Sequence, residues 1–192
     1  REGVFASVLH GGMIRSGDTM KFVPRQGKRP YQAAVITLSD KGSRGERIDE
    51  SGPVIVQTLQ QHGYDIVETI LLPDGEDALK RQLIRLADQR QVDLILTTGG
   101  TGFGQRDVTP EATLAVATRL VPGIAEAMRS ASLSITKRAM LSRAVSVIRG
   151  KTLIINLPGS PNACRECMAV FLDTIPHGMD LLRGDVSDCA AK

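Results

Sequence analysis

Tryptophan is absent from this 192-residue chain, and aromatic residues make up only 3% of it. So few aromatic side chains disfavour the base-stacking surfaces of proteins that bind single-stranded nucleic acid. The formal net charge of +3 does not by itself indicate a polyanionic partner. No apolar run approaches the roughly 18 residues that a membrane-spanning helix needs. We therefore expect neither nucleic acid nor membrane as a partner.

Cysteine is also scarce. Cys164, Cys167 and Cys189 are odd in number and cluster late in the chain, unlike a disulfide framework, so we expect a cytoplasmic protein. Cys164 and Cys167 have no second pair at zinc-site spacing, and we expect them to be buried as small apolar residues. The chain opens with Arg1 and shows no signal-peptide pattern, so we expect Arg1 to be the cut end of a longer protein.

The composition that remains is that of a globular protein, with 42% hydrophobic and 23% charged residues. Residues 3–23 show short β-rich runs separated by glycine-containing turns, which is too little chain to bury a core of its own. A polar linker follows. We expect three parts: a β-rich fragment with its linker at 1–31, a main domain at 32–186 and a tail at 187–192.

Strand-like and helix-like segments alternate from residue 33 onward. Strands are expected at 33–38, 66–72, 93–98, 145–148 and 152–156, and helices at 53–62, 77–89, 111–120, 123–135 and from Pro161. The pattern predicts an α/β fold with three layers, in which helices cover both faces of a mostly parallel sheet. In such a sheet, ligands bind beyond the carboxyl ends of the strands.

A glycine-rich loop at residues 98–111 follows the third predicted strand. Four of its glycines lie within six residues, and they let the backbone bring N–H groups close to an anion. Thr109 can cap the next helix, with Pro110 at its first position. The spacing fits neither the Walker pattern nor the dinucleotide fingerprint. The loop is therefore either an anion site of unnamed ligand or a tight turn without one.

Two other segments end strands at the same predicted edge. Residues 156–162 combine a turn with Ser160 as a helix cap and Pro161 in the first turn, which suits either a phosphate site or a plain turn. Residues 38–47 mix Ser, Gly, Lys and Arg, as expected of a flexible phosphate-binding loop or of a solvated loop.

Asp74 lies in a Pro-Asp-Gly turn and would in isolation be interpreted as a turn former. It follows a predicted strand, however, and so shares its edge of the sheet with Asp107 of the glycine-rich loop. Two carboxylates beside glycine loops could hold Mg²⁺, which neutralises phosphate oxygens during transfer.

Five motifs together match a known family. They lie at residues 39–40, 97–102, 106–113, 140–143 and 155–161. On these motifs, residues 33–184 resemble the MogA/MoaB family of molybdopterin adenylyltransferases. Separately, residues 1–23 resemble the end of a MOSC domain, a type of domain associated with molybdenum-cofactor handling, through residues 3–6 and 11–18.

The resemblance implies molybdenum cofactor biosynthesis by adenylyl transfer. Molybdopterin and ATP, with Mg²⁺, would give adenylyl-molybdopterin and pyrophosphate, the terminal phosphate of the pterin attacking the α-phosphorus of ATP. Such a step needs alignment and charge compensation more than covalent chemistry. The resemblance also implies a homotrimer, with other molybdenum-cofactor biosynthesis proteins as further partners.

The family's functional residues carry over by position. Asp74 and Asp107 match the two catalytic aspartates, which would hold Mg²⁺ or orient the reactants. The residues expected to bind nucleotide or molybdopterin are Ser39, Asp40, Thr98, Gly99, Gly100, Thr101, Gly102, Arg106, Ser142, Arg143, Asn156, Pro158, Gly159 and Ser160. Two alternatives stay open: a non-catalytic molybdopterin-binding or scaffold module, and a nucleotide pyrophosphatase. The presence of both aspartates favours the transferase, since a binder would need neither.

Overall fold

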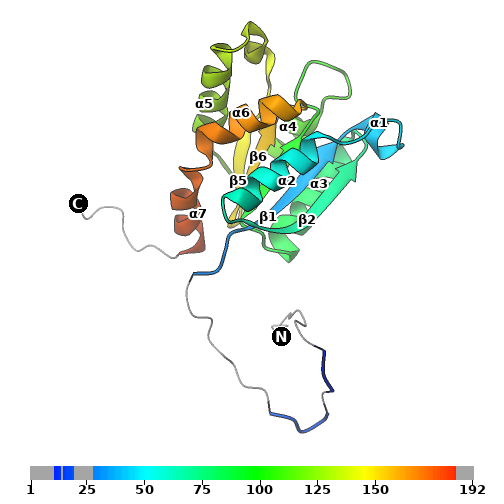
Figure 1. The fold of residues 1–192 in the computed structure, drawn as a ribbon, viewed down its shortest axis with the longest axis vertical. Helices are drawn as coiled ribbons and strands as arrows, with labels where there is room; N and C mark the ends of the chain where they lie inside the picture. The colour runs from blue at the N-terminus through cyan, green and yellow to red at the C-terminus, as the bar shows by residue number, and fades with distance from the viewer. Residues whose placement is uncertain (1–10, 14, 20–27, 185–192) are drawn as a thin grey trace, which may run out of the picture.

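The computed structural model describes residues 11–13, 15–19 and 28–184 (Figure 1). The strands expected within residues 3–23 fall largely outside these ranges, as does the expected tail. Within them, Ser16 and Gly17 form the expected turn, in which the Asp18 N–H donates to the Arg15 carbonyl over 3.1 Å.

A six-stranded sheet in the order β2-β1-β3-β6-β5-β4 forms the centre of the molecule. The strands are β1 Gln32–Leu38, β2 Asp65–Leu72, β3 Leu94–Thr98, β4 Arg119–Leu120, β5 Ser146–Arg149 and β6 Thr152–Leu157. The first four strands in that order pair in parallel, whereas β5 pairs antiparallel with both β6 and β4. The sheet is thus mostly parallel, as predicted.

Helices cover both faces of this sheet. They are α1 Asp40–Ser43, α2 Ser51–Gln61, α3 Glu76–Ile84, α4 Thr109–Ala115, α5 Pro122–Leu133, α6 Pro161–Phe171 and α7 Ile175–Arg183, with the π-helical η1 Arg85–Gln89 and the 3₁₀-helical η2 Lys137–Leu141. Figure 1 looks onto the face that carries α2, α5 and α6. None of the helices in the described ranges has the length and apolarity needed to span a bilayer.

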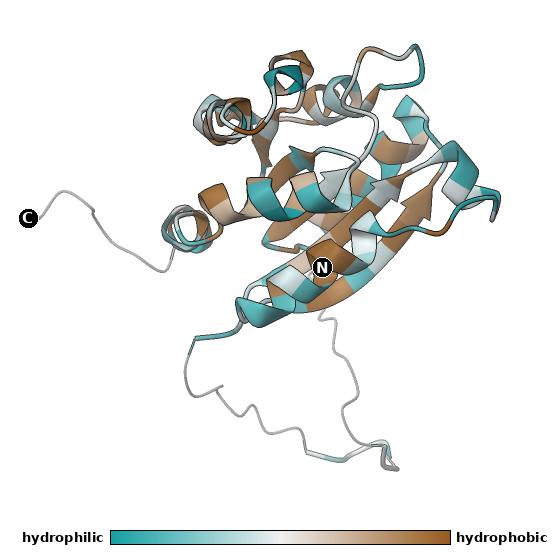
Figure 2. Ribbon diagram, turned by 45° about the horizontal axis from the view of Figure 1, so that its top comes forward, coloured by the Kyte–Doolittle hydropathy of each residue, from teal (hydrophilic) through white to brown (hydrophobic). Residues whose placement is uncertain are grey.

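Alternation along the strands explains the three layers. Ala33 and Val35 of β1 pack into a core with α2, α5, α6 and α7, whereas Ala34 and Ile36 pack into a second core with α3, η1 and α4. Successive side chains of a strand point to opposite faces, so a strand buried on both faces is apolar throughout. Figure 2 shows these hydrophobic strands between amphipathic helices. Cys164 and Cys167 are unpaired and buried in the first core, as predicted.

Three predicted elements differ from the structure. The helix expected at 111–120 ends at Ala115, and Arg119–Leu120 instead pairs with β5 as a short edge strand. The helix expected from Pro161 is two helices, α6 and α7. The segment 38–47, expected as a flexible or solvated loop, contains α1, in which the Ser39 Oγ accepts the Gly42 N–H over 3.0 Å. These differences arise from local capping and from pairing at the sheet edge, and neither can be predicted from the spacing of apolar residues.

Candidate functional site

Four chain segments meet at the carboxyl ends of the parallel strands. Ser39 and Asp40 follow β1, and Asp74 follows β2. The glycine loop, residues 99–107, follows β3, and residues 158–160 follow β6. Because these strands are parallel neighbours, segments distant in sequence lie at one edge, as the sequence predicted.

Asp74 and Asp40 bind each other's backbone. The Asp40 N–H donates to Asp74 Oδ2 and the Asp74 N–H donates to Asp40 Oδ1, each over 3.1 Å. The Arg106 guanidinium crosses from the glycine loop, donating to Asp40 Oδ1 over 2.7 Å and to the Asp74 carbonyl. The ends of β1 and β2 and the glycine loop are thereby joined through one exposed arginine.

The two aspartates of this pair differ in electrostatic state. The hydrogen bond from Arg106 lowers the pKa of Asp40. Burial raises the pKa of Asp74, and the negative charges of Asp40 and Asp107 add to this rise. Asp74 is therefore a carboxylate that would gain from a nearby cation.

Asp107 is held by the loop that contains it. Its Oδ2 accepts the Gly104 N–H over 2.8 Å, and its own N–H donates to the Gly104 carbonyl over 2.9 Å. A Cβ atom on Gly102 or Gly104 would lie 2.8 or 2.9 Å from Asp107 Oδ2. Both glycines are thus needed for this carboxylate to fold back over the loop.

Gly99 and Gly100 are needed for a different reason. Both adopt left-handed conformations, with φ of +94° and +64°. A Cβ on Gly99 would lie 2.4 Å from the Leu38 carbonyl, and one on Gly100 would lie 2.5 Å from Thr109 Oγ1 and 3.6 Å from Asp74 Oδ1. The loop therefore passes close beside Asp74, and its own Asp107 carboxylate folds back over Gly102 and Gly104.

Arg143 holds the glycine loop and, with Asp107, lines an open cavity of about 500 Å³. Its guanidinium donates to the Gly102 carbonyl over 2.6 Å, to the Asp107 carbonyl and to Glu111. Its backbone N–H donates to the Thr101 carbonyl over 3.0 Å. This arginine positions the backbone of Asp107, and its contact with an anion stays a prediction.

Asn156 and Thr98 are likewise positioning residues. Asn156 is fully buried, and its amide nitrogen donates to Thr97 Oγ1 and to Thr113 Oγ1, each over 2.9 Å. Thr98 Oγ1 donates to the Pro158 carbonyl over 2.7 Å. Both side chains are satisfied by other buried polar groups, and the role predicted for them in ligand binding stays a prediction. Thr109, expected as a helix cap, instead donates from Oγ1 to the Gly99 carbonyl over 2.8 Å.

The β6 loop forms one wall of a cavity. Gly159 lies beside Gly99: a Cβ atom added to Gly159 would be 3.5 Å from the Gly99 Cα, in ordinary van der Waals contact. Between them and Ser39 lies a polar cavity of about 170 Å³. Ser160 stands at the N-cap of α6 but makes no side-chain cap bond. Helix N-termini favour anions.

A second, apolar pocket lies behind this loop. It has a volume of about 200 Å³ between α5, η2 and α6, and its lining includes Ser142 and Pro158 as well as Met128, Ala144 and Cys167. Ser142 and Pro158 thus line one pocket, and its lining does not include Asp74 or Asp107.

Sequence reasoning missed Asp49, which lines the polar cavity. Its Oδ1 accepts the N–H groups of Ser51 and Gly52, each over 3.0 Å, and so fixes the start of α2. Ser51 Oγ then donates to the Gly159 carbonyl over 2.8 Å. The signal was present, because an Asp shortly before a Ser-Gly-Pro sequence, here residues 51–53, is typical of a helix start.

Asp74 and Asp107 have the chemistry of magnesium ligands. Asp74 and Asp107 each use Oδ2 for a backbone N–H and leave Oδ1 without a partner among the described residues. No group of three or more His, Cys, Asp or Glu in the described ranges could hold a metal ion. Two carboxylates fit Mg²⁺ that shares its coordination with substrate phosphates and water.

Comparison with known proteins identifies the family of this chain. A family model described as a probable molybdopterin binding domain matches residues 34–177. The chain belongs to this molybdopterin binding domain family. The molybdopterin adenylyltransferases of Haemophilus influenzae and Helicobacter pylori strain 26695 are 45% and 41% identical to it, over 78% and 79% of this chain and 76% and 87% of theirs.

A solved member shows the same fold. The molybdopterin biosynthesis enzyme MoaB of Thermus thermophilus matches with a TM-score of 0.76 and 44% identity, over 80% of this chain and 97% of that chain. The family match begins at residue 34 and does not reach residues 1–23. The resemblance of that segment to a MOSC domain has no support from these comparisons.

Proposed function

We propose that this chain is a molybdopterin adenylyltransferase that works in molybdenum cofactor biosynthesis. Molybdopterin and ATP are its substrates, and adenylyl-molybdopterin and pyrophosphate are its products. The observation that carries the proposal is that Asp74, which follows β2, lies beside the glycine loop that contains Asp107, in a chain 45% and 41% identical to adenylyltransferases.

Some site residues would contact the substrates, and others hold the contacting residues in position. Asp74 and Asp107 would hold Mg²⁺, which when bound supplies positive charge to phosphate oxygens. Backbone N–H groups at Gly99–Gly100 and at the start of α6 would orient the phosphates. Arg106, Arg143 and Asn156 keep these groups in place through the contacts described above. The flat pterin would enter the apolar pocket beside Ser142 and Pro158.

Further properties belong to the same proposal. A homotrimer, a cytoplasmic location and association with other molybdenum-cofactor biosynthesis proteins follow from the family resemblance. Free Cys164 and Cys167 are consistent with a reducing compartment. A MOSC-like fragment at residues 1–23 would join two units with related tasks in one chain.

The decisive experiment measures pyrophosphate release by the full chain with Mg²⁺ and ATP, with and without molybdopterin. Release that requires molybdopterin, together with adenylyl-molybdopterin as product, is the expected result. Release from ATP alone would instead make the chain a nucleotide pyrophosphatase. Binding of both substrates without release would make it a scaffold module.

A further inference from the structure

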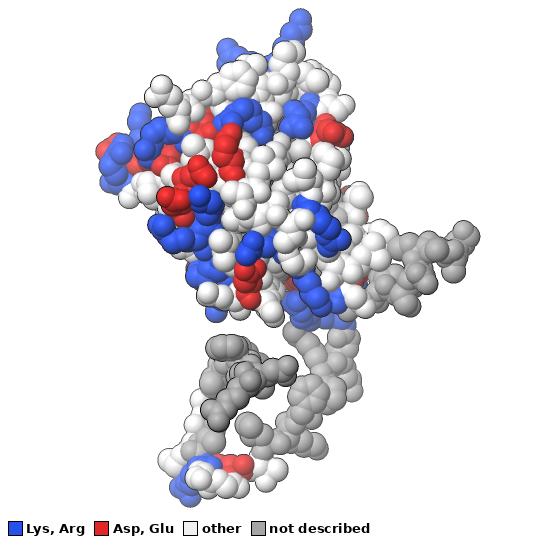
Figure 3. Space-filling view, turned by 180° about the vertical axis from the view of Figure 1, so that it is seen from behind, with Lys and Arg blue, Asp and Glu red and all other residues white. Residues whose placement is uncertain are grey.

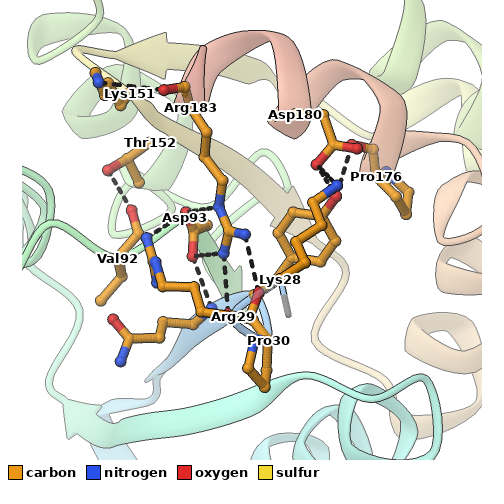
Figure 4. Close-up of polar contacts among 12 residues, drawn as sticks. Lys28, Arg29, Pro30, Val92, Asp93, Lys151, Thr152, Pro176, Asp180 and Arg183 are labelled. Carbon is orange, nitrogen blue, oxygen red and sulfur yellow. Dashed lines mark hydrogen bonds and ion pairs between the residues drawn. The ribbon is translucent and has the colours of Figure 1, made fainter. Parts of the chain in front are cut away.

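Charged side chains at the amino-terminal edge of the sheet pair with one another. Asp93, just before β3, accepts hydrogen bonds from Arg29 and Arg183 (Figure 4). Lys28 forms an ion pair with Asp180 in the same region. Figure 3 shows basic and acidic side chains side by side over the face of the molecule behind that of Figure 1. The carboxyl edge of the sheet differs, because two backbone donors there have no partner among the described residues.

These donors are the N–H groups of Gly159 and Ser160, in the loop between β6 and α6. None of the hydrogen bonds among the described residues uses either group. The eleven-residue helix α6 begins directly after them, so both N–H groups lie at the positive end of its dipole. Unpartnered N–H groups at such a position suit a phosphate. At the start of α2, in contrast, Asp49 already accepts the N–H groups of Ser51 and Gly52.

Two buried side chains hold the Pro158 carbonyl. Thr98 Oγ1 donates to it over 2.7 Å and Cys164 Sγ over 3.0 Å, and both residues are completely buried. A trans peptide unit is planar, with its C=O and N–H pointing in opposite directions, and the described residues contain no cis peptide bond. The Gly159 N–H therefore points away from this buried pair.

Ser51 holds the next carbonyl along the chain. Its Oγ donates to the Gly159 carbonyl over 2.8 Å, and no other donor among the described residues reaches that carbonyl. Hydroxyl groups near a helix start commonly bond to their local backbone, whereas this one joins residues 108 positions apart. Ser51 is the first residue of α2 and is only 7% exposed, so its hydroxyl is held by a regular helix. By the same planarity, the Ser160 N–H points away from α2.

We propose that Ser51 is a positioning residue of the transferase. It holds the Gly159 carbonyl so that the N–H groups of Gly159 and Ser160 bind the terminal phosphate of molybdopterin. This inference rests on the proposed function. The choice of substrate follows from the apolar pocket assigned to the pterin, because its lining includes Pro158 and Ala163, which flank the two N–H groups along the chain. Donors whose directions are already fixed lose less freedom on binding than donors of a mobile loop.

The test uses the full chain and measures molybdopterin binding by calorimetry without ATP, and then the KM and kcat of pyrophosphate release. Ser51→Ala should weaken molybdopterin binding and raise the KM of molybdopterin about tenfold, because the two N–H groups lose their fixed directions. The KM of ATP and kcat should stay as in the wild type, as expected when only binding of one substrate is lost. Ser51→Thr, which keeps the hydroxyl, should restore the wild-type values.

Ser146→Ala is the matched control. Ser146 is also buried, and its Oγ donates to the Val121 carbonyl over 2.6 Å, outside this loop and outside the lining of the pterin pocket. This variant should lower the melting temperature as Ser51→Ala does, but it should bind molybdopterin like the wild type.

Four results would each overturn the proposal: wild-type molybdopterin binding in Ser51→Ala, equal losses of binding in the two alanine variants, a rise in the KM of ATP alone, or no recovery in Ser51→Thr at an unchanged melting temperature. If the wild type binds molybdopterin but releases no pyrophosphate, the transferase is rejected, and the binding measurements still test the role of Ser51. Failure of this inference and failure of the proposed function are therefore separate results.

Discussion

Asp74 and Asp93 lie at opposite edges of the same sheet and have opposite environments. Asp93, just before β3, accepts hydrogen bonds at both carboxylate oxygens, from two arginines and one backbone N–H. Asp74, just after β2, accepts one backbone N–H at Oδ2, and its Oδ1 faces the glycine loop. Both oxygens of the Asp93 carboxylate thus have hydrogen-bond partners within the protein, whereas Asp74 Oδ1 has none among the described residues and is available to a ligand.

The pKa shifts follow the same division. Burial opposes the ionisation of Asp93, but hydrogen bonds from Arg183 and Gln32 outweigh it and lower its pKa. Burial raises the pKa of Asp74, and no cation neutralises it fully. A buried carboxylate thus marks a candidate site only when its pairing is incomplete, because a paired one is structural.

The largest expected effect is on catalysis at the carboxyl edge. Asp107→Asn and Asp74→Asn should each lower molybdopterin-dependent pyrophosphate release about 10³-fold, or about 4 kcal/mol, because charge compensation is lost. Circular dichroism should show the fold intact. Turnover like that of the wild type in both variants would reject the catalytic role of the pair.

The next effect sharpens the comparison by making the same substitution at both edges. Asp93→Asn should lower the free energy of unfolding by about 3 kcal/mol, since it removes the buried carboxylate charge that Arg183 and Arg29 share. Asp74→Asn should leave stability equal or higher, because Asn still accepts the Asp40 N–H and removes a buried charge. Urea denaturation measures both. Equal destabilisation at the two positions would show that the Asp93 and Asp74 carboxylates contribute alike to stability, which contradicts the comparison.

The smallest effect is the pH dependence of these two stability differences. The pKa of Asp93 is lowered in the folded state, so its contribution is present above the unfolded pKa of about 3.9 and is lost as pH falls through the folded value. The gap between wild type and Asp93→Asn should therefore narrow in acid.

For Asp74 the sign is reversed. Its raised pKa favours the folded state below the unfolded value of about 3.9, and this contribution is lost as pH rises through the folded value. The advantage of Asp74→Asn should thus appear only on the neutral side. Denaturation of the three proteins across a pH range of about 3 to 7 checks both directions, and parallel curves would contradict them.

The sequence predicted the layers and the common edge because these depend on repeating patterns. The continuous apolar runs of β1, β3 and β6 require burial on both faces, and their parallel pairing brings the following loops together. The positions of Asp74 and Asp107 at this edge follow from the pairing. The residues alone suggested that they could hold Mg²⁺, and the family resemblance added a catalytic role.

Contacts between distant side chains could not be predicted in this way. Nothing local to Arg143 or Asn156 indicates that one holds the Asp107 carbonyl and the other bridges Thr97 and Thr113. The hydrogen bonds among Arg29, Asp93 and Arg183, at the amino-terminal edge of the sheet, likewise join residues more than 150 positions apart in sequence. Such pairs depend on tertiary packing, which cannot be predicted from hydrophobic periodicity or capping patterns.

The most direct test of the central claim is Mn²⁺ binding, followed by electron paramagnetic resonance, in the presence of a non-hydrolysable ATP analogue. Mn²⁺ serves as the probe in place of Mg²⁺. One bound ion for each chain is predicted, lost in both Asp74→Asn and Asp107→Asn and retained in Asp93→Asn. Binding that persists in the first two variants would show that these carboxylates do not share an ion, and would contradict the account.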